Sequence, residues 1–294
     1  MTLSSDVDER TLVKDTDRPA ERPGRGALER STMSRRSTTL IQITIVIVVL
    51  LGWEFMPKVT ALQSLSHAFD PYFVSSPSRI AIRTWELFTG ANDSTLLGPY
   101  LWRTVSSAVV GTAIGMGLGS FAGLLLSNSE SLNRIFRPFL VAINATPRIA
   151  LIPIIVLFFG ASFETSVVSA VLVVFFVAFF NAFEGGRSVA PELVQNVMLL
   201  GGKRWQILTQ VRGRFALAWA FAVLPLALTF GLITVVTAEI LTGFGGVGYL
   251  LTIATSQADS TLTFSLVIVL AVVGVVTVII ADKIRDRVLH WWGK

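Results

Sequence analysis

The sequence predicts an all-α membrane protein with six transmembrane helices. Of its 294 residues, 52% are hydrophobic and only 15% are charged, which is a poor match to an ordinary soluble domain. Several apolar runs reach the length of about 20 residues that a helix needs to cross a bilayer. Segments that carry Lys and Arg separate these runs. The lipid bilayer is therefore the first partner we expect.

Composition also excludes several kinds of site. The chain has no cysteine and two histidines, so it cannot form disulfides or thiolate metal sites, and we expect no bound metal. The net charge of +5 could suggest nucleic acid as a partner. Basic residues that border apolar spans are explained more simply by orientation in the membrane. We therefore expect no nucleic-acid binding.

The first hundred residues contain one span. Residues 1–38 mix eight basic with seven acidic residues and lack the apolar periodicity that a folded core needs, so we expect a disordered tail. Leu40–Met56 is the first predicted span. Residues 57–99 form a polar loop with an amphipathic piece at Ile80–Phe88.

The second span is predicted at residues 101–126 and carries glycines at every fourth position. In lipid, small residues at this spacing let two helices approach closely. The third segment, Pro138–Gly160, contains Pro147 and Pro153, so we expect it to be kinked or split. Arg148 lies between these prolines and must face protein, water or headgroups at membrane depth. A snorkelling interfacial arginine and a transport-path residue are both compatible with this position.

The remaining spans are predicted at Thr165–Phe183, Phe215–Leu241 and Phe264–Ala281. The fifth contains Pro225 and has Glu239 near its end. A glycine-rich loop follows it, and residues 127–137 are expected to form a short polar turn. Six spans place both termini on one side, and the positive-inside rule assigns that side to the cytoplasm because most Lys and Arg lie there.

A polar interruption at residues 184–214 stands out between the fourth and fifth spans. Its sequence predicts a helix that begins near Ser188 and Pro191, a break at Gly201-Gly202, and a second helix over Lys203–Val211. Val194, Val197, Met198 and Gly201 would share one face of the first helix. This segment could lie on lipid headgroups or could bind a cytoplasmic partner.

The chain shows no means of converting energy by itself. It has no phosphate-binding GxxxxGK[ST] loop, and Glu239 is the best candidate for an acidic residue inside a span. No catalytic arrangement is visible, so we expect a transport subunit rather than an enzyme. The observations favour a subunit that another protein drives.

Val194–Val211 resembles the cytoplasmic EAA loop of binding-protein-dependent ABC importer permeases. Gly201 matches the glycine of that loop and Trp205 its aromatic residue, while Gln195-Asn196-Val197 occupies its triplet in place of acidic and small residues. Further segments look like the permease branch for aliphatic sulfonates, taurine, nitrate and related small anions or heterocycles, which has a MetI-like fold. These segments are SSPSRI (75–80), residues 102–126, ATPRIALIPIIVLFFG (145–160), NAFEGGRSV (181–189) and AEILTGFGGVGYLL (238–251).

The resemblance implies a mechanism. Two permease subunits are expected to pair as a homodimer in the bacterial inner membrane. A dimer of cassette ATPases would bind ATP and Mg²⁺ and contact the loop, and an external binding protein would deliver a small anionic solute. ATP hydrolysis would occur on the separate ATPase, and the permease itself would need no cofactor. The residues implied in coupling are Gln195, Asn196, Val197, Met198, Leu200, Gly201, Gly202, Lys203 and Trp205. The residues expected along the translocation path are Pro147, Arg148, Asn181 and Glu239.

We therefore divide the chain into three parts. Residues 1–38 are expected to be a disordered cytoplasmic tail, 39–99 the first transmembrane helix with an external loop, and 100–290 the permease core with its coupling helix in the loop at 184–214. Two alternatives remain: a secondary transporter or channel that works alone, and a membrane scaffold that recruits a soluble partner. Inverted repeats or several charges within the spans would favour the first alternative.

Overall fold

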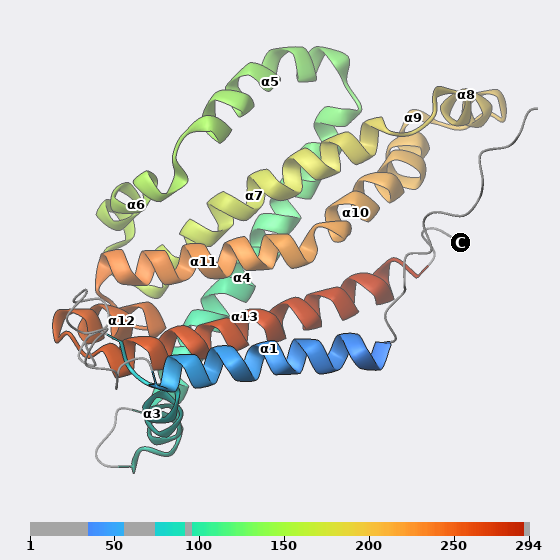
Figure 1. Ribbon diagram of the computed structural model, residues 1–294. Coiled ribbons are helices and arrows are strands. Elements are labelled where there is room, and N and C mark those ends of the chain that lie inside the picture. Colours follow the sequence, from blue (N-terminus) through green and yellow to red (C-terminus); the bar gives the residue numbers. More distant parts are fainter. Residues whose placement is uncertain (1–34, 56–73, 92–95, 291–294) are drawn as a thin grey trace, which may run out of the picture. The chain divides into compact units, whose positions relative to one another are not determined.

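The computed structural model describes residues 35–55, 74–91 and 96–290, and each regular element within these ranges is a helix (Figure 1). Contacts between residues separate the chain into two units, residues 1–49 and 50–294. We describe each unit by itself. In chain order, the helices are α1 (Arg35–Phe55), α3 (Pro77–Thr89), α4 (Leu97–Ser127), α5 (Glu130–Ala145), η4 (Arg148–Leu151), α6 (Ile152–Phe159), α7 (Phe163–Arg187), α8 (Pro191–Leu199), α9 (Arg204–Gln206), η5 (Ile207–Arg212), α10 (Gly213–Ala222), α11 (Leu224–Thr242), α12 (Val247–Ser256) and α13 (Ser260–Val288).

Up to six membrane crossings are present in the described part of the chain. Five helices are long and apolar enough to span a bilayer: Ser37–Phe55 within α1, together with α4, α7, α11 and α13. The sixth candidate is α5 followed by η4–α6, which is bent by 87°. This bend confirms the split expected from Pro147 and Pro153, because proline removes a helical hydrogen bond and clashes with the preceding turn. The predicted helical membrane architecture is confirmed.

The most extensive helix pair is α4 against α7. The predicted glycine ladder mediates it: all four glycines, Gly111, Gly115, Gly119 and Gly123, are buried. A Cβ atom on Gly111 would come within 2.6 Å of the Ala170 Cβ, and one on Gly115 within 2.9 Å of the Val174 Cβ. Without side chains at these positions the two backbones approach closely, which strengthens dispersion contacts in lipid.

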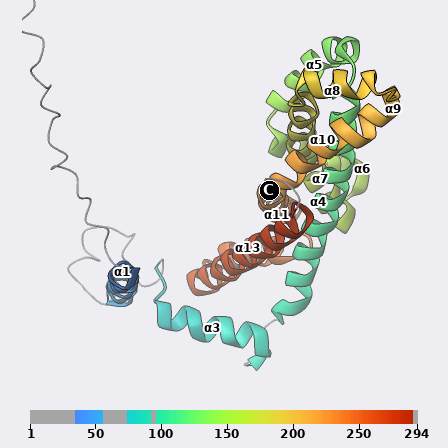
Figure 2. The same cartoon turned by 90° about the vertical axis from the view of Figure 1, so that its right-hand side faces the viewer.

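The fifth predicted span is two helices rather than one. α10 ends at Ala222 and α11 begins at Leu224, so Pro225 lies in the first turn of α11, where its missing N–H costs little. Both helices pack against α7, and α11 also packs against α4 and α13 (Figure 2).

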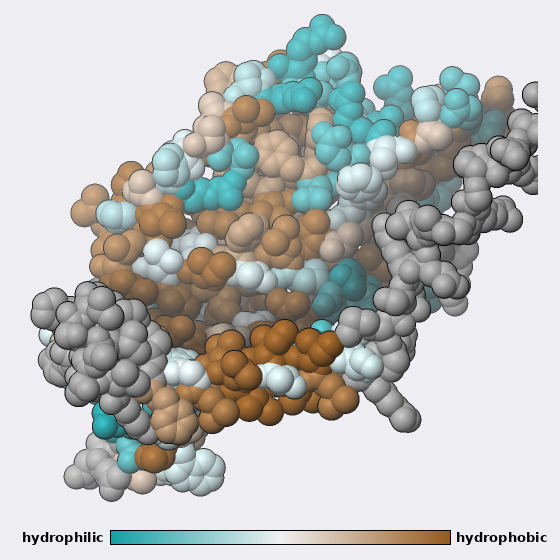
Figure 3. Space-filling model, in the orientation of Figure 1, coloured by the Kyte–Doolittle hydropathy of each residue, from teal (hydrophilic) through white to brown (hydrophobic). Residues whose placement is uncertain are grey.

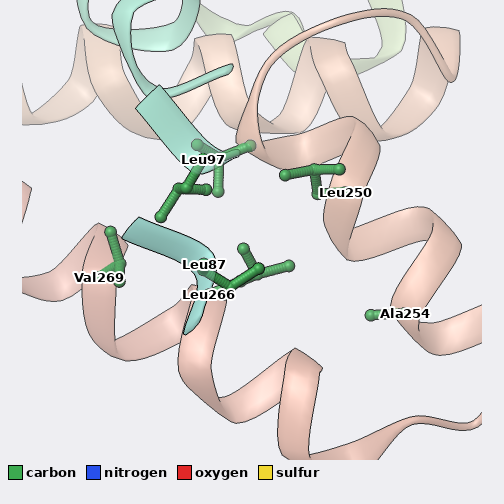
Figure 4. Packing of buried hydrophobic residues seen from close by; sticks show 7 residues of the cluster. Leu87, Leu97, Leu250, Ala254, Leu266 and Val269 are labelled. Carbon is green, nitrogen blue, oxygen red and sulfur yellow. The ribbon is translucent and has the colours of Figure 1, made fainter. Parts of the chain in front are cut away.

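One hydrophobic core joins α3, the start of α4, α12 and α13. Leu87, Leu97, Leu250 and Leu266 are buried there and approach one another from these four helices (Figure 4). We call this the α12 end of the molecule, and the end that carries α8 the loop end. Hydrophilic residues gather over α5 and α8 at the loop end, whereas hydrophobic surface covers much of the bundle (Figure 3).

Two sequence-based expectations are wrong. The polar turn at 127–137 is mostly helix, because the Ser129 hydroxyl accepts a hydrogen bond from the Leu132 N–H and begins α5 at Glu130. The glycine-rich loop after α11 contains the ten-residue helix α12, which packs against α4, α11 and α13. In both cases local composition suggested a loop and packing produced a helix.

The three-part division of the chain stays a prediction. Most of the expected disordered tail lies outside the described residues, and its last four residues, 35–38, form the first turn of α1. α3, which was assigned to the external loop, packs against α13 and α4 and shares their core.

Candidate functional site

The break at the end of α8 has the geometry of a glycine C-cap. Gly201 has φ +81°, a left-handed conformation that side chains disfavour. Its N–H donates to the Met198 carbonyl at 3.0 Å, and the Gly202 N–H donates to the Val197 carbonyl at 2.9 Å. These two bonds satisfy carbonyls that the end of the helix would otherwise leave unpaired. The helix stop predicted at Gly201-Gly202 is confirmed.

The start of α8 differs from the prediction. Ser188 is the C-cap residue that follows α7, and its hydroxyl donates to the Gly185 carbonyl at 2.8 Å. The residue that precedes Pro191 at the beginning of α8 is Ala190, so α8 has no side-chain N-cap. Pro191 occupies the first turn as expected, since its backbone angle suits that position.

Large apolar side chains of the loop are exposed. Leu199 is 84%, Leu200 88% and Trp205 70% exposed. The residues of the expected apolar face of α8 differ in exposure: Val194 and Val197 are half-buried, while Met198 and Gly201 are exposed. A cluster of exposed apolar residues at the surface marks a site of contact with either another protein or the membrane.

The other predicted coupling residues are spread around this surface. Gln195, Asn196 and Lys203 are exposed, and Gly202 is half-buried. A Cβ atom on Gly202 would lie 2.5 Å from a methyl group of Val197, so the tight turn admits only glycine here.

The second predicted helix begins at Arg204 and runs directly into α10. Its middle, η5, is a π-helix over Ile207–Arg212. Ile207 is buried and Leu208 half-buried, so this segment packs on the bundle while Trp205 points outward. Such π-helical turns are rare and often mark functional positions.

Arg148 begins η4, at the bend between α5 and α6. Its guanidinium lies 5.5 Å from the ring centroid of Phe176 on α7 and donates to the Asn144 side chain. Its Nε is buried and has no hydrogen-bond partner among the described residues. Pro147 is exposed, and the Asn181 side chain donates to the Val177 carbonyl of its own helix at 2.8 Å.

Glu239 lies in the last turn of α11, at the α12 end. Its side chain is 0% exposed. It accepts a hydrogen bond from the Thr104 hydroxyl at 2.9 Å and from the Gly248 N–H at 3.0 Å. The Val247 N–H in turn donates to the Thr104 hydroxyl at 2.9 Å. Together these groups cap the N-terminus of α12, whose first N–H groups have no partner in the helix.

The four expected path residues thus fall into separate environments. Arg148 and Pro147 lie at the bend, and Asn181 bonds within α7. The Glu239 carboxylate joins Thr104 of α4 to the first turn of α12. Thr104 was missed by the sequence analysis because it is 135 residues from Glu239 and resembles any polar residue in a span. Among the described residues, no group of three or more His, Cys, Asp or Glu could hold a metal ion.

Known proteins resemble this chain over most of its length. Residues 115–290 match the family described as "Binding-protein-dependent transport system inner membrane component". The riboflavin transport system permease protein RibX of Chloroflexus aurantiacus is 28% identical over 76% of this chain and 82% of its own. The putative aliphatic sulfonates transport permease protein SsuC of Bacillus subtilis is 27% identical over 65% of this chain and 70% of its own.

A solved structure shares the fold. A chain of the MetNI methionine ABC transporter in an inward-facing conformation matches with a TM-score of 0.53 and 19% identity. The match covers 64% of this chain and 93% of that one.

Proposed function

This chain belongs to the binding-protein-dependent transport system inner membrane components, the permease subunits of ABC importers, and we propose that it admits a small anionic solute while a separate ATPase drives it. It is a multi-pass membrane protein. The observation that carries the proposal is the exposed apolar surface of the loop around Leu199, Leu200 and Trp205. A short helix with an apolar stripe fits a groove on a soluble partner.

The loop would lie in the cytoplasm, together with both termini. Lys and Arg concentrate in the tail, in this loop and after the last span, as the positive-inside rule requires for cytoplasmic segments. ATP and Mg²⁺ would bind to the ATPase dimer, whose closure moves α8. Gln195, Asn196 and Lys203 would form the polar rim of the contact, and Gly201 the fixed bend.

A second copy of the chain would complete the membrane part. Leu157 and Phe158 on α6 are strongly exposed, and α6 has few neighbours besides α7. In lipid, exposed apolar residues alone do not require a partner. The sparse packing around a bent span favours a homodimer that supports this segment from the other side.

Arg148 would line the path of the solute. Its guanidinium carries a buried Nε without a partner among the described residues and sits at a break in a span. Charged residues at such breaks mark ion and substrate paths. RibX and SsuC are named for the transport of riboflavin and aliphatic sulfonates. A guanidinium suits the sulfonate class because its N–H groups can donate to two oxygens of the same oxyanion.

The main test is purification of the chain with its ATPase. We expect a cassette ATPase to co-purify in equal amount, and uptake into proteoliposomes to require ATP and the binding protein. The Gly201→Val variant should still bind the ATPase yet hydrolyse ATP without uptake, because a β-branched residue resists the left-handed bend. Uptake by the purified chain without nucleotide would instead support a stand-alone secondary transporter or channel.

A second test addresses Arg148. Arg148→Ala should lower solute uptake while ATPase assembly stays intact, and Arg148→Lys should recover part of the uptake because it restores the charge. Unchanged uptake by Arg148→Ala would assign Arg148 to the headgroup region.

A further inference from the structure

The coupling helix α8 reaches the bundle chiefly through η5. α8 packs mainly against η5, and η5 continues into α10. A pocket of about 420 Å³ lies between α8 and the end of α4, and Gln195 of α8, Asn128 and Arg212 are among its lining residues. Because this space is not filled by side chains, α8 is held at the bundle by a few defined contacts.

η5 is in turn connected to the end of α4 by Arg212, the last residue of η5. Its Nη1 donates to the Ser127 carbonyl at 2.9 Å and to the Asn128 side-chain oxygen at 3.1 Å. Ser127 is the last residue of α4, so its carbonyl has no partner within that helix. A guanidinium at this position also interacts favourably with the negative end of the helix dipole.

A second bridge connects the loop with α5. The Arg187 guanidinium lies 3.3 Å from a carboxylate oxygen of Glu130, and both side chains are well exposed. Exposed ion pairs contribute little to coupling because water screens them. The half-buried Arg212, which bonds to a helix end, is the stronger connection.

Motion at the end of α4 would extend through the membrane. α4 and α7 pack through the glycine ladder with their backbones close together, so the two helices respond together to a displacement of either. Contiguous packing of this kind is the physical route by which two sites can be coupled.

We infer that Arg212 is a positioning residue that fastens the π-helical turn of the loop to the C-terminal end of α4. It makes α4, together with α7, follow the coupling helix when the ATPase closes. This inference rests on the proposed function, in that an ATPase supplies the movement. The hydrogen bond between Arg212 and the end of α4 does not require the ATPase, because it forms within this chain.

Spin-label distances test the inference directly. The chain has no cysteine, so Leu125→Cys on α4 and Gln210→Cys on η5 give one label pair at two exposed positions. We expect a narrow distance distribution in the wild-type background, and the same distance in the nucleotide-free and ATP–vanadate states of the complex with ATPase. The Arg212→Gln variant should broaden the distribution in the chain alone and shift it between the two states of the complex.

Two variants control for charge and for folding. Arg214→Gln removes an exposed arginine two residues away and should leave the distribution narrow, whereas Arg212→Lys should fall between the wild type and Arg212→Gln because it keeps one donor. A wild-type distance that shifts between the two states, or an Arg212→Gln distribution equal to that of wild type, would overturn the inference. Absence of ATPase from the purified complex would instead count against the proposed function, while the width measured in the chain alone would still test the bond to α4.

Discussion

The two ends of the bundle contain the same local pattern and use it in opposite ways. At the loop end, α8 is followed by Gly201 at φ +81° and then by α9; at the α12 end, α11 is followed by Gly243 at φ +60° and then by α12. The first pattern presents exposed leucines and a tryptophan. The second encloses a carboxylate that is bonded on several sides.

The difference shows how surroundings decide the role of a helix–glycine–helix segment. At the α12 end, polar groups of Glu239 and Thr104 satisfy the first N–H groups of α12 inside a packed core. At the loop end, backbone hydrogen bonds satisfy the turn locally and leave the side chains free for a partner. We therefore expect mutations at the α12 end to change stability and mutations at the loop end to change assembly.

The largest effect is expected for Glu239→Ala. This change leaves the Gly248 N–H and the Thr104 hydroxyl without their carboxylate partner in a buried site, and should destabilise the protein by about 3 kcal/mol. The thermal midpoint of the detergent-solubilised protein, followed by size-exclusion chromatography, measures the loss. Glu239→Gln keeps an acceptor oxygen and should lose roughly half as much. An unchanged thermal midpoint for Glu239→Ala would show that the hydrogen bonds of Glu239 do not stabilise the protein.

An intermediate effect is expected for Trp205→Ala, in binding rather than in stability. Truncation of a large exposed aromatic residue at the centre of an interface typically costs about 2 kcal/mol, which corresponds to roughly 30-fold weaker affinity for the ATPase. Titration of the ATPase against the solubilised chain measures it. Trp102→Ala provides the matched control, because Trp102 is similarly exposed but lies at the far end of α4. Equal losses of affinity in the two variants would contradict a specific loop surface.

The smallest effects are expected for the paired variants Gly201→Ala and Gly243→Ala. Both glycines have positive φ and open space where a Cβ would lie, so each substitution should cost about 1 kcal/mol of stability from backbone strain alone. The thermal midpoint should fall by a similar amount in both. Only Gly201→Ala should also lower the uptake achieved per ATP hydrolysed, since only that bend would contact the ATPase. If Gly243→Ala also lowered the uptake per ATP hydrolysed, the effect would not be specific to the loop end.

Much of the fold follows from local sequence. The apolar runs determine the spans because a lipid-facing backbone must satisfy its own hydrogen bonds. The proline pair around Arg148 determines the bend, the glycines of α4 determine its contact face, and Gly201-Gly202 ends α8. Each of these features depends on residues of one continuous segment of the sequence.

The remaining features depend on residues that are distant in sequence. α12 looked like a glycine-rich loop, and its N-terminus is completed by Thr104, more than 140 residues earlier. Glu239 is predicted along the translocation path from sequence, and only the structure shows that its carboxylate also accepts a hydrogen bond from the first turn of α12. In the sequence, Arg212 is one of several basic residues of the loop. Only the structure shows that its hydrogen-bond acceptors lie at the end of α4. Sequence alone determined which segments cross the membrane, the bend at Arg148 and the end of α8, because these depend on local composition and backbone geometry. Only the tertiary structure decided which polar groups meet, because their hydrogen bonds form between helices that the chain brings together only on folding.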